Sequence, residues 1–130
     1  MSGVKIALDT NIAIAVLNDA QGAGEWVRRF QEIYLPVPVV GELIFGALNS
    51  QRPQENLARV QELIIRCIVL ETKASTASLY AHIRLQLKHK GKPIPENDLW
   101  IAALCLEHNI PLATEDAHFL EVQGLSVERR

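Results

Sequence analysis

The sequence is poor in the features that mark membrane proteins, secreted proteins and strongly basic nucleic-acid-binding proteins. Its 130 residues hold no apolar run of about twenty, the length that a membrane-spanning helix needs. The N-terminus has no basic region followed by a long apolar stretch, as a signal peptide would. Thirteen Lys and Arg against 15 Asp and Glu give a formal net charge of −2, which argues against nucleic-acid binding by bulk positive charge. We therefore expect a cytoplasmic protein that does not enter membranes.

Cysteine and aromatic residues are scarce as well. The two cysteines, Cys67 and Cys105, lie in apolar segments without a CxxC pair, so we expect buried thiols rather than a disulfide. Aromatic residues make up 5% of the chain, which leaves aliphatic side chains to fill the core. Hydrophobic residues amount to 48% and charged residues to 22%, as in soluble globular proteins. The length fits one domain over residues 1–130.

Short apolar segments alternate with segments of helical periodicity along the whole chain. The expected strands cover residues 4–8, 33–35, 67–70, 112–114 and 124–127. The expected helices cover residues 10–17, 26–31, 39–50, 53–66, 73–90, 97–108 and 117–122. This alternation predicts an α/β domain in which helices flank a parallel sheet. Ligands of such sheets bind beyond the carboxyl ends of the strands.

Four acidic residues lie either just after an expected strand or on an expected helix, and they are candidates for a functional site. Asp9 directly follows the first expected strand, and Asp116 comes two residues after the segment LAT. Asp98 shares a helix face with apolar residues such as Ile101, where a charge is costly unless it is paired or bound to a metal. Glu42 lies in the nearly all-apolar segment VGELIFGAL. If the four converge, they form one acidic pocket.

Each of these acids also has an ordinary structural explanation. Asp9 fits the N-cap of the helix that follows it, and Asp98 fits a first-turn acid that interacts with the helix dipole. Glu42 fits an exposed surface acid, and Asp116 fits a turn residue. The case for function is that all four occur together, at strand ends and on inward helix faces.

Convergence of the four would favour a bound cation. Carboxylates in one pocket repel one another and raise one another's pKa unless a cation neutralises them. Hard oxygen ligands without a Cys or His cluster suit Mg²⁺ or Mn²⁺. A site of this kind supports the attack of water on a phosphodiester or phosphoryl group.

Four motifs taken together resemble a known family. The segments ALDTN, GELIFGAL, ENDLWIAA and LATEDAHF resemble the motifs of PIN-domain ribonucleases, most closely the VapC-type toxins of bacterial toxin–antitoxin pairs. The likeness spans essentially the whole chain, and the order and spacing of the motifs make it specific. It implies a Mg²⁺- or Mn²⁺-dependent endoribonuclease that cuts single-stranded segments of RNA, often in structured RNAs such as tRNA. The implied products carry 5′-phosphate and 3′-hydroxyl ends, and the implied partners are an antitoxin protein and a second copy of the chain.

The resemblance also implies roles for individual residues. The acidic quartet that holds the metal would be Asp9, Glu42, Asp98 and Asp116. Its three aspartates would be the main metal ligands, and Glu42 would share the metal or orient water. The supporting polar residues would be Thr10, Asn11 and Thr114. The sequence departs from the family where a Ser or Thr often precedes the glutamate, because the segment PVPVV there has no hydroxyl.

Several other polar residues lie near these motifs. The best local basic patch, a candidate contact for RNA phosphates, consists of Arg84, Lys88, Lys90 and Lys92. Cations at a helix C-terminus are also favoured by the helix dipole, which is the more ordinary explanation. Glu96 is either a fifth, outer carboxylate or a solvated loop residue. For His118 we expect a surface or capping role rather than a substrate contact. Candidate dimer contacts are the apolar helix at 10–17 and the helix at 53–66.

Two other functions deserve comparison with the nuclease. A non-catalytic PIN-like module that binds RNA or protein would be expected to lack a quartet member, yet all four are present. A phosphatase or phospho-receiver needs a nucleophilic Asp with a Lys near the strand ends. The only Lys in the strand-end motifs is Lys5, inside the first strand, so we rank this function low.

Overall fold

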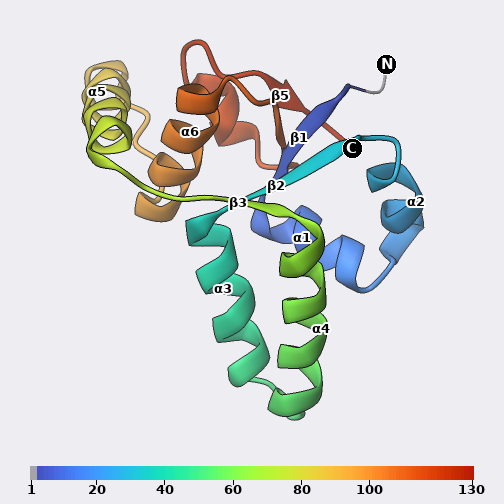
Figure 1. Ribbon diagram of the computed structural model, residues 1–130. Helices are drawn as coiled ribbons and strands as arrows, with labels where there is room; N and C mark the ends of the chain where they lie inside the picture. The colour runs from blue at the N-terminus through green and yellow to red at the C-terminus, as the bar shows by residue number, and fades with distance from the viewer. Residues whose placement is uncertain (1–2) are drawn as a thin grey trace.

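The centre of the fold is a parallel sheet of five strands, seen in a computed structural model that describes residues 3–130. The strands are β1 (Lys5–Leu8), β2 (Glu32–Pro36), β3 (Ile68–Leu70), β4 (Leu112–Ala113) and β5 (Val127–Glu128). They lie in the order β3-β2-β1-β4-β5, and every neighbouring pair is parallel. Helices flank this sheet (Figure 1), which confirms the expected α/β class.

Helices make the connections between the strands. They are α1 (Thr10–Leu17), α2 (Ala23–Val27), α3 (Val37–Leu48), α4 (Pro53–Arg66), α5 (Ala74–Lys90) and α6 (Glu96–His108), with two 3₁₀ turns, η1 (Ala20–Gly22) and η2 (Ala117–Glu121). In Figure 1, α3 and α4 form a hairpin that extends away from the sheet, and α5 lies alongside α6. Among residues 3–130, no helix has the length and apolar character needed to cross a membrane.

The α3–α4 hairpin shows how the sequence pattern produces packing. Pro53 occupies the first turn of α4, where its missing N–H costs nothing, and the helix has the bounds expected from its periodicity. Val60 and Leu63 recur at a helical step and are buried. Across from them, α3 buries Leu43 and Ala47. The apolar stripes of α3 and α4 face each other, the charged residues of α4 are left in solvent, and the outer side of α3 exposes Phe45 and Leu48.

Two expected elements lie elsewhere than the sequence pattern indicates. The helix expected at 26–31 is wrong, because α2 runs from Ala23 to Val27. Gly22, at φ 77°, sets its start, and Asp19 Oδ1 accepts a hydrogen bond from Gly24 N (3.1 Å). The last strand follows Gly124 (φ 84°) rather than including it, and covers Val127–Glu128. Cys105 is buried as expected, whereas Cys67 is half-buried, and both are free thiols.

The strand order creates a crevice beyond the carboxyl ends of the neighbouring strands β1 and β4. From β1 the chain builds β2 and β3 on one side, and it then crosses over to build β4 and β5 on the other. Connections therefore leave β1 and β4 in opposite directions, which opens the space beyond their carboxyl ends. The pairing of Leu8 with Ala113 brings Asp9 beside Thr114, and Asp9 N donates to Ala113 O (3.0 Å). The fold thus places the two strand-end motifs side by side.

Candidate functional site

Asp9 is the most enclosed acid at the β1–β4 crevice, with only 5% of its surface exposed. It is the N-cap of α1, and its Oδ1 accepts a hydrogen bond from Thr10 N (2.8 Å). Its Oδ2 accepts a second bond from Thr114 Oγ1 (2.7 Å). Burial raises the pKa of Asp9, these two hydrogen bonds lower it, and the neighbouring charges of Asp116 and Glu42 raise it. The capping role is confirmed, and it fixes the carboxylate at the crevice.

Asp98, Asp116 and His118 form a compact group beside Asp9. Asp98 projects from the first turn of α6, and its Oδ2 lies 2.7 Å from His118 Nε2. One ligand atom from each of the three residues lies within 4.8 Å of the others. The pKa of Asp98 is raised by burial, lowered by the hydrogen bond with His118, and raised by the charges of Asp9 and Asp116. These acids therefore share one electrostatic environment.

His118 has a contact with a site acid that the expected surface or capping role does not include. Its side chain is half-buried and contacts Asp98 across 20 residues of sequence. The turn η2 causes this, because it places His118 just beyond Asp116, while the next residue, Phe119, is fully buried and anchors the turn. A histidine two residues after a candidate acid, at the start of a short apolar turn, was the available signal in the sequence.

Glu42 reaches the site from α3. It is exposed, as the surface-acid explanation expects, yet its Oε1 accepts a hydrogen bond from Asn97 Nδ2 (3.0 Å) in the first turn of α6. Its charge also contributes to the raised pKa of Asp9. Asn97, which sequence reasoning did not single out, thus links Glu42 to the helix that carries Asp98.

Of the three supporting polar residues, Thr114 has the most extensive role. It is fully buried, and its hydroxyl donates to Asp9 and accepts from Asp116 N (3.0 Å). Thr10 Oγ1 is buried and has no hydrogen-bond partner among the described residues. Asn11 is exposed on the first turn of α1.

The donor set fits a hard divalent cation. Asp9, Asp98 and Asp116 supply carboxylate oxygens from three different elements, and burial and mutual repulsion raise the pKa of the first two. The buried hydroxyl of Thr10, next to Asp9, is a polar atom that finds no hydrogen-bond partner within residues 3–130. A cation would relieve the repulsion between these carboxylates.

Most of the basic residues near the C-terminal end of α5 form ion pairs with acidic side chains. Lys90 and Lys92 bridge to Glu121 at the end of η2, with N–O distances of 3.0 and 3.5 Å. Arg84 pairs with Glu96 (3.7 Å). Within residues 3–130, Lys88 forms no ion pair, and with Arg84 it lines a cavity of about 650 Å³ between α5 and the start of α6.

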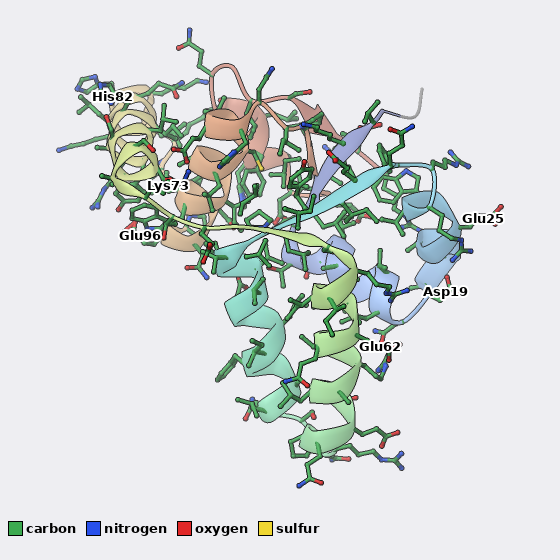
Figure 2. All side chains as sticks on the ribbon, viewed as in Figure 1. Asp19, Glu25, Glu62, Lys73, His82 and Glu96 are labelled. Carbon is green, nitrogen blue, oxygen red and sulfur yellow. The ribbon has the colours of Figure 1, made fainter. Side chains whose placement is uncertain are left out.

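The partners of Glu96 are residues of α5, and none of them belongs to the acidic quartet. Glu96 begins α6, at the end of that helix nearest α5 (Figure 2), and it accepts hydrogen bonds from Tyr80 Oη (2.5 and 2.6 Å). Tyr80 in turn stacks on Trp100, with ring centroids 4.1 Å apart. These hydrogen bonds therefore link α6 to α5.

Comparison with known proteins decides the family. A model of the PIN domain matches residues 6–125. The chain belongs to the PIN-domain family. It is 30% identical over 122 residues to Ribonuclease VapC2 of Haemophilus influenzae, covering 91% of each chain. It is also 30% identical over 130 residues to the tRNA(fMet)-specific endonuclease VapC of Shigella flexneri, covering 96% of this chain and 97% of that one.

Solved PIN-domain structures have the same architecture. The DNA-bound VapBC complex of Salmonella typhimurium matches with a TM-score of 0.88 and 27% identity over 98% of both chains. VapBC-1 of nontypeable Haemophilus influenzae matches with a TM-score of 0.86 and 28% identity over 96% of this chain and 97% of that chain. The expected VapC-type PIN fold is thereby confirmed.

Proposed function

We propose that this PIN domain, spanning residues 1–130, is the toxin of a VapC-type pair and acts as a divalent-metal-dependent endoribonuclease. The observation that carries the proposal is the convergence of Asp9, Asp98 and Asp116 at the β1–β4 crevice, with Glu42 held beside them by Asn97. The names of the curated relatives, ribonuclease and tRNA-specific endonuclease, support RNA as the substrate and tRNA as the first candidate. Such a substrate places the action in the cytoplasm.

The chain's own residues prepare the site for hydrolysis. Bound Mg²⁺ or Mn²⁺, held by Asp9, Asp98 and Asp116, would stabilise negative charge on the phosphate and make water a better nucleophile. Thr114 and the N-terminus of α1 hold the Asp9 carboxylate in one orientation. Glu42, the most exposed acid of the quartet, would accept a hydrogen bond from the attacking water. Water attack on phosphorus with departure of the 3′-oxygen, which takes up a proton, would leave a 5′-phosphate and a 3′-hydroxyl.

RNA would be held beside the quartet by a small number of cations. The cavity lined by Arg84 and Lys88 has an apolar floor of Leu87, Ile94 and Leu99. Arg84 and Lys88 would contact phosphates, and the floor would contact a base or sugar. Lys90 and Lys92, which pair with Glu121, and Arg84, which pairs with Glu96 in the same cavity, would contribute less than Lys88. This arrangement is compatible with the chain's net charge of −2, since binding uses a local patch.

An antitoxin and a second copy of the chain are the proposed protein partners. The matched solved structures are VapBC complexes, which supports an antitoxin. A cavity of about 280 Å³ between α1, α3 and α4 is lined by Ile14 and Gly46 and also by Glu42, so a segment seated there would reach the quartet. Co-purification with the product of a neighbouring small gene tests the antitoxin, and light scattering tests the dimer. Ile65, 82% exposed on α4, is available for such contacts.

The decisive experiment is RNA cleavage by the purified protein in Mg²⁺, in Mn²⁺ and in EDTA. Asp98→Asn should abolish cleavage, whereas Glu115→Gln, which changes an exposed acid in the same loop as Asp116, should retain it. Metal-dependent cuts with 5′-phosphate ends would support the proposal. Equal behaviour of the wild type and both variants, with the fold intact, would refute catalysis and favour a non-catalytic binding module.

A further inference from the structure

His118 brings a nitrogen donor into a site whose other candidate ligands are oxygens. Its Nε2 lies 2.7 Å from Asp98 Oδ2, and one atom from each of Asp98, Asp116 and His118 lies within 4.8 Å of the others. Adjacent ligands of one octahedral ion are about 3 Å apart and opposite ligands about 4 Å apart. The spread of this group is therefore close to that of a single ion's ligands.

The imidazole is held in place from several directions. Phe119, the next residue, is fully buried, and its ring centroid lies 4.9 Å from that of His118. At the far end of η2, Glu121 O accepts hydrogen bonds from Gln86 Nε2 (3.2 Å) and Lys90 Nζ (3.0 Å) of α5. The turn that carries His118 is thus fixed to the core at one end and to α5 at the other, which favours a stable ligand position.

We propose that His118 Nε2 is a direct ligand of the cation held by Asp98 and Asp116, so that the site prefers Mn²⁺ and Co²⁺ over Mg²⁺. This inference rests on the proposed metal-dependent function. Imidazole nitrogen suits transition metals, whereas Mg²⁺ takes oxygen ligands almost exclusively. Ligation would use the Nε2 lone pair, so the imidazole would keep its proton on Nδ1 and release any proton on Nε2 to solvent; the contact with Asp98 Oδ2 would then be lost and that oxygen would be free to bind the ion.

The rival role for His118 is to orient Asp98 without touching the ion. In that role the hydrogen bond to Asp98 Oδ2 would persist in the loaded site, and every cation would depend on it equally. Glutamine at this position separates the two roles. Its amide N–H can donate to Asp98, but the amide nitrogen has no free lone pair for a metal, and its carbonyl oxygen is a hard ligand that does not favour Mn²⁺ and Co²⁺ over Mg²⁺.

The test is metal binding by the full-length protein, freed of metal with a chelator. Calorimetric titration with Mn²⁺, Co²⁺ and Mg²⁺ should show His118→Gln and His118→Ala binding Mn²⁺ and Co²⁺ at least about tenfold more weakly, with Mg²⁺ affected far less. His89→Asn, which removes an exposed imidazole from α5, should match the wild type. Circular dichroism checks that each variant is folded.

Pulsed electron paramagnetic resonance of the Mn²⁺-loaded protein gives a second readout. The wild type should show a directly bound nitrogen that changes when histidine is labelled with ¹⁵N, and His118→Gln should lose it. Equal weakening of all three metals, full rescue by His118→Gln or absence of the nitrogen signal would each overturn the assignment. Nitrogen-coupled Mn²⁺ in a protein that cuts no RNA would refute the proposed nuclease and leave the ligand assignment standing.

Discussion

Replacement of Thr114 by valine tests whether the crevice depends on one buried hydroxyl. Valine has nearly the same shape as threonine but can neither donate to Asp9 Oδ2 nor accept from Asp116 N. Thr114 is fully buried at the end of β4, so water cannot easily replace the lost partner. The substitution should therefore leave a buried carboxylate and a backbone N–H unsatisfied without opening a cavity.

The expected cost follows from these two hydrogen bonds. A bond to a charged group contributes about 1.5–3 kcal/mol and a neutral one about 1 kcal/mol, so Thr114→Val should lose about 2.5–4 kcal/mol of unfolding free energy. For a domain of this size, that corresponds to a melting temperature lower by roughly 8–16 °C. Thr114→Ser keeps the hydroxyl and loses one methyl group, which should cost about 1 kcal/mol.

The pH dependence of this loss identifies its cause. The hydrogen bond from Thr114 lowers the pKa of Asp9 by favouring the ionised carboxylate, so its removal raises that pKa further. The stability loss should be full at pH 7 and should shrink as the pH falls and Asp9 becomes protonated in both proteins. Chemical denaturation of metal-free wild type, Thr114→Val and Thr114→Ser at pH 7 and near pH 4 measures this. A valine variant as stable as the serine variant, or an equal loss at both pH values, would refute the reasoning.

Two further predictions concern the metal and the α5–α6 contact. Mg²⁺ or Mn²⁺ at a hundred times its dissociation constant should stabilise the wild type by about 2.7 kcal/mol in thermal melts. EDTA should reverse this gain in stability. An equal gain in Asp98→Asn would contradict metal binding at Asp98. Glu107 accepts hydrogen bonds from Ser75 and the buried Thr76, which lower its pKa. Glu107→Ala should cost about 1–3 kcal/mol at neutral pH, and the loss should fade as the pH falls through the folded pKa of Glu107; an unchanged loss in acid would contradict this origin.

Local patterns were enough to predict most elements of the fold. The helix at 53–66 was predicted with its observed bounds because its apolar stripe, its first-turn proline and its basic C-terminus all agree. The helix near Trp26 was misplaced because its start depends on the left-handed Gly22 and on a hydrogen bond from Gly24 N to Asp19. The strand order, with β1 between β2 and β4, is set by packing of distant segments and has no local signal.

In the candidate site as well, some residues could be predicted from local sequence and others could not. Asp9 and Asp98 were predictable because each stands beside an apolar pattern where an unpaired charge is costly. Contacts made by His118 and Asn97 were not, since both depend on how α6 lies against η2 and α3. The pairing of Lys90 and Lys92 with Glu121 also joins segments that lie about thirty residues apart. Sequence reasoning identified the acids but could not identify which neighbours hold them.

The acids of the crevice are better suited to binding a cation than to stabilising the metal-free fold. The pKa values of Asp9 and Asp98 are raised, chiefly by burial, so their ionised forms are less favourable in the folded chain than in the unfolded one. Their contribution to stability is therefore lost as the pH rises through the raised pKa values, and near neutral pH the metal-free site opposes folding. A divalent cation among these carboxylates reverses that penalty, so metal binding and fold stability are thermodynamically linked. Residues selected for stability alone would not place three carboxylates, and a buried Thr10 hydroxyl without a partner among residues 3–130, beyond the carboxyl ends of β1 and β4.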